Sequence, residues 1–172
     1  DGNSLFFISN FGRDNETYMG EDGIYSLDLF TGKTEEIFYD EHMGILDARL
    51  SPQDANLIAL EANGPELDYF AWKLFLLDIS ADQMTELVPE EQWPIHFEFS
   101  PDGQFLAYSQ LHQGEFDLCV RDNSSMQSLC GLSEEFLHEQ GDLIAILNWL
   151  PNSREMSLLF FMPDASCYRT AV

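Results

Sequence analysis

The sequence repeats itself at intervals of about fifty residues. Three segments, residues 48–52, 97–101 and 147–151, align on Pro52, Pro101 and Pro151. After a short turn, each proline is followed by an apolar stretch that has the length of a β-strand. A recurrence at this spacing indicates a chain built from structural repeats, each of which buries its apolar surface against its neighbours.

A second pattern recurs between the prolines. Residues 24–29 and 34–37 read as two strands joined by a turn that contains Gly32, and residues 74–87 and 117–130 repeat this hairpin. Each repeat therefore holds four strands, A to D: strand A ends at the proline, strand B follows it, and strands C and D form the hairpin. Four antiparallel strands in about fifty residues predict an all-β fold made of β-propeller blades. A β-sandwich is disfavoured because its strands do not recur as a similar block of four.

The residues of these turns resemble a known family. Ser100-Pro101-Asp102-Gly103 and the hairpin over residues 24–34 are similar to the TolB-like, WD-like β-propeller repeats, and similar blades occur in prolyl oligopeptidase-type proteins. The turn departs from this pattern at residues 51–54 and at residues 150–153. The resemblance implies a propeller fold. It also implies protein–protein contacts as the role, or the gating of substrate beside a separate hydrolase domain.

The repeats predict a single propeller segment over residues 1–172, divided at about 1–50, 51–100, 101–150 and an incomplete 151–172. These are about three and a half blades, whereas closed propellers have four to eight. An open arc would expose an apolar blade face and unpaired strand edges. We therefore expect a part of a larger ring, and a homodimer that closes a ring is the alternative.

Two cysteines flank the third hairpin. If its loop is centred between Ser124 and Ser125, Cys119 and Cys130 are directly opposed, at a separation that suits a disulfide. A disulfide would indicate an oxidising, extracytoplasmic compartment, either periplasmic or secreted. The alternative is two free cysteines in a packed strand pair.

The chain is strongly acidic, with 31 Asp and Glu residues against 7 Lys and Arg and a formal net charge of -24. This charge argues against nucleic acid and anionic membrane surfaces as partners, and no apolar run is long enough to insert into a membrane. In a blade, the D–A and B–C loops lie at one end, and we expect the acidic residues there to form a binding face. These residues are Asp14, Glu16, Glu21, Asp22, Asp40, Glu41, Glu90, Glu91, Glu134 and Glu135.

Such a face would attract a protein or peptide with a basic surface. Two other interpretations remain open: the charges only keep the protein soluble, or residues 14–16 and 21–23 supply oxygen ligands for calcium. Calcium spacing of the EF-hand kind is absent from the sequence, so no metal or cofactor is expected.

Polar residues also recur on strand A, where they could line a central channel. They occupy the positions three and five residues before each proline: Asp47, Arg49, His96, Glu98 and Asn148. His96 with Asp47 and Glu98 would suit acid–base chemistry, but polar bridges between blades explain the same pattern. The sequence has no Gly-x-Ser-x-Gly nucleophile motif, and we expect no catalysis by this chain.

Overall fold

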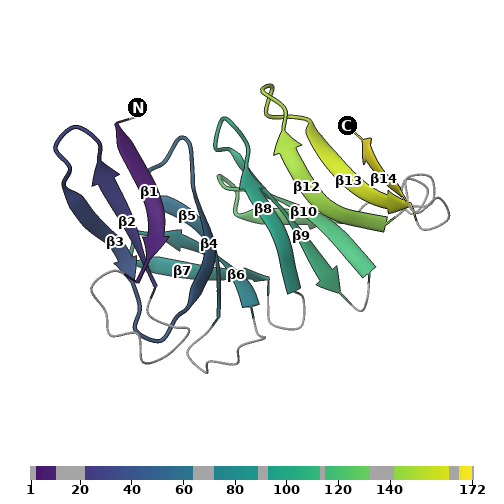
Figure 1. Cartoon of the computed structure of the whole chain (residues 1–172). Helices are drawn as coiled ribbons and strands as arrows, with labels where there is room; N and C mark the ends of the chain where they lie inside the picture. Colours follow the sequence, from purple (N-terminus) through teal and green to yellow (C-terminus); the bar gives the residue numbers. More distant parts are fainter. Residues whose placement is uncertain are drawn as a thin grey trace. The chain divides into compact units, whose positions relative to one another are not determined.

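Strands and turns account for the described structure. The computed structural model describes residues 3–10, 22–63, 72–88, 93–112, 115–131, 142–162 and 167–171, which contain fourteen strands in four antiparallel sheets (Figure 1). The first two sheets consist of β1 (Ser4–Ser9), β2 (Gly23–Asp28) and β3 (Thr34–Tyr39), and of β4 (Ile45–Leu50), β5 (Leu57–Asn63), β6 (Trp72–Asp78) and β7 (Gln83–Val88). The last two consist of β8 (Trp93–Phe99), β9 (Phe105–His112), β10 (Glu115–Asp122) and β11 (Gln127–Cys130), and of β12 (Asp142–Trp149), β13 (Met156–Met162) and β14 (Cys167–Ala171).

Each sheet is a meander in which consecutive strands pair. The predicted strands A to D are β4–β7 in the second sheet and β8–β11 in the third. The β1–β3 sheet holds strands B, C and D, and the β12–β14 sheet holds strands A, B and C. The all-β prediction of four-stranded repeats is thus confirmed. The predicted repeats were divided at the Ser-Pro turns, and each such turn joins strand A to strand B within one sheet.

The chain divides into two compact units, Asp1–Leu50 with Asn56–Glu90, and Ser51–Ala55 with Glu91–Val172. In the first unit, the β1–β3 and β4–β7 sheets bury one core between them. Ile58 and Leu60 of β5 are fully buried there, and Phe6 and Ile8 of β1 pack against them. Alternate residues of each strand face this core, as the period of two in a strand requires. No helix long and apolar enough to cross a membrane is found among the described residues.

In the second unit, Trp149 connects the β12–β14 sheet with the β8–β11 sheet. Its indole Nε1 donates a hydrogen bond of 3.0 Å to the carbonyl oxygen of Glu98, and its ring stacks on Phe105 with centroids 6.2 Å apart. The A–B turns add a second contact, since the Asp102 N–H donates to Ser153 Oγ at 3.1 Å. Gly103 has a φ of +66°, and a Cβ there would lie 2.9 Å from Gln53 Cβ. Glycine is therefore required by conformation and by space.

The three described C–D turns share one design, which the sequence analysis did not identify. An aspartate ends strand C, and its Oδ1 accepts backbone N–H groups of the turn: Asp28 from Phe30 and Thr31, Asp78 from Ala81, and Asp122 from Ser124 and Ser125. Four residues after the aspartate, the backbone has a positive φ, at Gly32, Asp82 and Met126. Hydrogen bonds to the charged carboxylate favour its ionised form, so the pKa of each aspartate lies below its ordinary value.

Replacing Asp78 by alanine should lower the melting temperature at pH 7, because the turn N–H of Ala81 and the hydroxyl of Ser80 lose their acceptor. A lowered pKa makes this stabilisation complete at neutral pH and removes it as the pH falls through the folded-state pKa, below 3.8. The difference between the wild type and Asp78→Ala should therefore shrink in acid. Thermal unfolding at several pH values measures it.

The matched control is Asp82→Asn in the same turn, because asparagine adopts the left-handed conformation of that position readily. Equal effects of Asp78→Ala and Asp82→Asn at pH 7 would contradict the role assigned to the Asp78 carboxylate.

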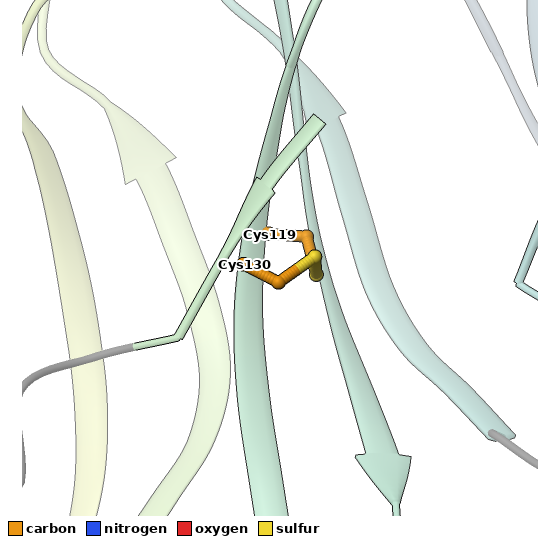
Figure 2. The surroundings of a disulfide bond; sticks show 2 residues. All are labelled: Cys119 and Cys130. Carbon is orange, nitrogen blue, oxygen red and sulfur yellow. A yellow bond between two sulfur atoms is a disulfide. The ribbon is translucent and has the colours of Figure 1, made fainter. Parts of the chain in front are cut away.

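A disulfide joins β10 to β11, as the sequence analysis proposed. Cys119 and Cys130 are direct partners in the antiparallel register, their Cα atoms are 4.0 Å apart, and Figure 2 shows the bond between the two strands. All four residues of β11 are exposed, including Leu129 at 79%. The corresponding strand β7 instead ends in the fully buried Val88. Covalent attachment thus replaces apolar packing in this outermost strand.

The double variant Cys119→Ala/Cys130→Ala should lose about 3 kcal/mol of unfolding free energy, the chain-entropy value for a loop of this size. Urea unfolding with and without dithiothreitol measures this loss, and the reductant should destabilise only the wild type. Non-reducing peptide mapping should recover Cys119 linked to Cys130. Two free thiols in protein made under oxidising conditions would contradict the assignment.

Candidate functional site

Three charged residues of the β4–β7 sheet lie on one face. Asp47 of β4 is the cross-strand partner of Glu61 of β5, and Arg49 lies two residues from Asp47 on the same side of the strand. The Arg49 guanidinium forms an ion pair with the Asp47 carboxylate, which also accepts the Ala48 N–H. The prediction that Asp47 and Arg49 share one side of strand A is consistent with this register.

Glu61 is the residue of this group that the sequence analysis missed. Its carboxyl is largely withdrawn from water and lies beside Asp47, and burial first and the Asp47 charge second raise the pKa of Glu61 from 4.5 to about 7. A signal for it exists in the sequence, because Glu61 interrupts the apolar run of strand B.

Asn63 occupies the next position on this face of β5. It is fully buried, and its Oδ1 accepts the Gly44 N–H at 2.5 Å, while its own N–H donates to the Gly44 carbonyl at 3.0 Å. These two bonds hold the start of β4 against the end of β5. The Asn63 Nδ2 is buried and has no hydrogen-bond partner in the part of the chain that the structure describes.

In the β8–β11 sheet, His96 and Glu98 lie on one side of β8, and Ser109 of β9 is the direct partner of His96. A serine, a histidine and a glutamate therefore share one face, which is the composition of a catalytic triad. An activated serine must hydrogen-bond to its base. Among the described residues, Ser109 Oγ has no hydrogen-bond partner and the residue is fully buried, whereas His96 and Glu98 have interactions of their own. The described contacts therefore include no hydrogen bond that would activate Ser109 as a nucleophile.

Asn148 of β12 is exposed. Register shifts in this strand place Asn148 opposite Ser157 and Ile146 opposite Leu158. These shifts interrupt the regular alternation of sides that the spacing of strand A residues in the sequence assumes. The lining of a channel by Asp47, Arg49, His96, Glu98 and Asn148 remains a prediction.

Three residues of the expected acidic face lie in the described structure. Asp22 precedes β2, and Asp40 and Glu41 follow β3. Asp40 Oδ1 accepts the His42 N–H at 2.8 Å, and Glu41 lies 3.4 Å from His42 Nε2. The other residues of this face lie outside the described residues: Asp14, Glu16, Glu21, Glu90, Glu91, Glu134 and Glu135.

The opposite end of the sheets is acidic as well. The three turn aspartates Asp28, Asp78 and Asp122 lie there, in addition to Asp54, Asp82 and Asp102. Hydrogen bonds from Ser100 Oγ and the Gln104 N–H hold the pKa of Asp102 below its ordinary value. Several carboxylates at this end therefore accept hydrogen bonds that stabilise the turns in which they lie. In the described ranges, no group of His, Cys, Asp and Glu residues is arranged to hold a metal ion.

Comparison with known proteins identifies the architecture. No family model and no curated protein sequence matches the chain. TolB from Acinetobacter baumannii matches 98% of this chain at a TM-score of 0.63 and 13% identity, and tricorn protease matches 98% at 0.65 and 17%. These sheets are β-propeller blades of the TolB-like, WD-like kind.

An oligogalacturonate lyase from Vibrio parahaemolyticus matches 98% of this chain as well, at a TM-score of 0.60 and 14% identity. This chain spans 38% of the TolB chain, 16% of tricorn protease and 50% of the lyase. By their names, these neighbours include a protease and a lyase beside TolB, so the fold alone does not assign an activity.

Replacing Glu61 by glutamine should stabilise the chain at pH 8 relative to the wild type. The folded wild type holds a proton on Glu61 up to about pH 7, while the unfolded chain releases it near 4.5. The unfolding free energy therefore falls as the pH rises through this window. Urea unfolding should show a larger gain for Glu61→Gln at pH 8 than at pH 5.

Glu35→Gln is the matched control, since the Glu35 side chain is 62% exposed. The same pH dependence in both variants would contradict the role of burial at Glu61.

Proposed function

We propose that this chain is a non-catalytic β-propeller segment that binds a protein or peptide with a basic surface through the acidic loops of its D–A and B–C end. The observation behind the proposal is the distribution of the net charge of -24. The strands contribute mostly apolar residues to buried positions, so the carboxylates are concentrated in the loops at the two ends of the sheets.

Several carboxylates at one end of the sheets are engaged in their own turns. At the A–B and C–D end, Asp28, Asp78, Asp102 and Asp122 accept hydrogen bonds from their own turns. A carboxylate engaged in this way has less capacity to receive a ligand cation. The ten acidic residues of the expected face belong to the D–A and B–C loops, and they include the pairs Glu90-Glu91 and Glu134-Glu135. Like charges gathered at one end raise the association rate of a basic partner.

The disulfide supports an extracytoplasmic location, because such bonds persist in oxidising compartments. A scaffold that binds partners outside the cytoplasm fits both the bond and the resemblance to TolB.

A second candidate is the propeller part of a prolyl-oligopeptidase-like serine hydrolase, in which the propeller gates and positions substrate. The observation that favours it is the match to tricorn protease, of whose chain these blades span 16%. A Gly-x-Ser-x-Gly motif in the coding sequence downstream of Val172 would select this candidate over the first.

The test compares two variants with equal net charge. The loop variant carries Glu90→Gln, Glu91→Gln, Glu134→Gln and Glu135→Gln, and the control variant carries Glu35→Gln, Asp54→Asn, Asp82→Asn and Glu155→Gln, which lie outside the D–A and B–C loops. Association with a lysine-rich peptide at low salt should slow several-fold in the loop variant only, and high salt should remove the difference. Biosensor kinetics measures both rates.

An equal reduction in both variants would assign the attraction to total charge and overturn the loop site. A glutamate-rich peptide of the same length controls for contacts that do not depend on charge. If neither variant differs from the wild type, the loop carboxylates only keep the protein soluble.

A further inference from the structure

The two cysteines of the β10–β11 disulfide differ in their access to water. Cys119 is 0% exposed, whereas Cys130 belongs to a strand whose four residues are all exposed. Thiol–disulfide exchange proceeds by attack of a thiolate on one of the two sulfur atoms, and its rate depends on access to that atom. An external thiol therefore reaches the bond, shown in Figure 2, from the side of Cys130.

Attack at Cys130 determines the products of the reaction. The thiolate of the reductant forms a bond to Cys130 Sγ, the bond between the two protein sulfurs breaks, and its electron pair leaves with Cys119 Sγ, which takes up a proton. If the reductant is a dithiol, its second thiolate attacks the mixed disulfide and releases Cys130, which is protonated in turn. The dithiol leaves as a disulfide, and the two electrons that it loses convert both cysteines to thiols.

Strand β11 lacks the apolar anchor that the other described D strands have. Its counterpart β7 ends in the fully buried Val88, and Ile37 and Phe38 of β3 pack against the core of the first unit. No residue of β11 is buried, and Leu129 is 79% exposed. The strand forms four cross-strand pairs with β10, but hydrogen bonds at an exposed edge exchange for bonds to water with little net gain. The disulfide is therefore the main attachment of β11.

The turn that leads into β11 also opposes the pairing. At the position where Gly32 and Asp82 have a positive φ, the third hairpin has Met126, with a φ of +60°. Glycine adopts this left-handed conformation freely and aspartate tolerates it, whereas a methionine side chain makes it unfavourable. Met126 is held there by a hydrogen bond from its N–H to the Asp122 carbonyl and by one from the Arg121 guanidinium to its own carbonyl. Release of β11 lets Met126 leave this conformation.

We propose that the bond between Cys119 and Cys130 is a redox switch: an external thiol attacks it at Cys130, and its reduction releases β11 from β10 while β8, β9 and β10 stay folded. These three strands keep apolar packing of their own, since Leu106, Ala107 and Leu118 are buried. Release makes β10 the outermost strand of its sheet, so the N–H and C=O groups along its outer edge become open to pairing with another strand. The thiol–disulfide balance of the surroundings thus selects between a closed and an open edge.

Hydrogen–deuterium exchange on the whole chain tests the release of β11. Reduction by dithiothreitol should raise the exchange rate of the backbone amides of Gln127–Cys130 by roughly tenfold or more, because the strand then opens without unfolding the sheet. The corresponding strand β7 is the internal control, and its exchange rate should not change, nor should that of β9. The double variant Cys119→Ala/Cys130→Ala should show the reduced pattern without any reductant.

Peptide mapping tests the site of attack. Brief reaction of the folded chain with glutathione, stopped in acid and analysed by mass spectrometry, should place the glutathione on Cys130 and leave Cys119 as a free thiol. The same reaction on the urea-unfolded chain is the control. It should place glutathione on both cysteines, because unfolding removes the difference in access between them.

If β11 keeps its protection from exchange after reduction or in the double variant, the proposal is overturned, because strand pairing alone then holds β11. Exchange that rises equally in β5, β7 and β9 would overturn it as well, since reduction would then unfold the whole chain. An adduct found mainly on Cys119 in the folded chain would overturn the assigned site of attack. These outcomes do not depend on the acidic loops, whose test uses a basic peptide.

Discussion

A sheet with apolar residues on both faces has to be covered on both faces, and most features of this chain follow from that requirement. Burial of Ile58, Leu60, Phe75 and Leu77 under the β1–β3 sheet contributes to the apolar stabilisation of the first unit. Since each blade is covered by a neighbour of the same kind, one blade cannot be stable alone. At least two neighbouring blades are therefore needed to form a stable folded unit.

The same requirement explains how a chain with a charge of -24 can fold. Among the described residues no carboxylate is fully buried, and the raised pKa of the partly buried Glu61 reflects the cost of burying a charge. At the turns, Asp28, Asp78 and Asp122 receive N–H groups that water would otherwise solvate. Part of the negative charge therefore stabilises the backbone.

The repeat, the strand order and the opposition of Cys119 to Cys130 could be predicted from the sequence because spacing alone determines them. It was harder to predict which residues of each strand A face the same side of the sheet. A bulge shifts the register between Ile146 and Asn148, and no residue type marks its position. Glu61 was visible as a charge in an apolar run, but its pKa depends on burial that only packing determines. The burial of Ser109, whose Oγ has no hydrogen-bond partner in the described ranges, is likewise a property of the packed sheet.

The turn after β2 differs from its counterparts at one position. Ser80 and Ser124 donate their hydroxyls to the turn aspartate, whereas Phe30 occupies this position in the first sheet and is 94% exposed. The turn closes nevertheless, because Asp28 accepts the backbone N–H groups of Phe30 and Thr31, which every residue except proline supplies. The conformation of the hairpin therefore does not depend on which side chain stands at position 30. The site could display a fluorescent or affinity label without disturbing the blade.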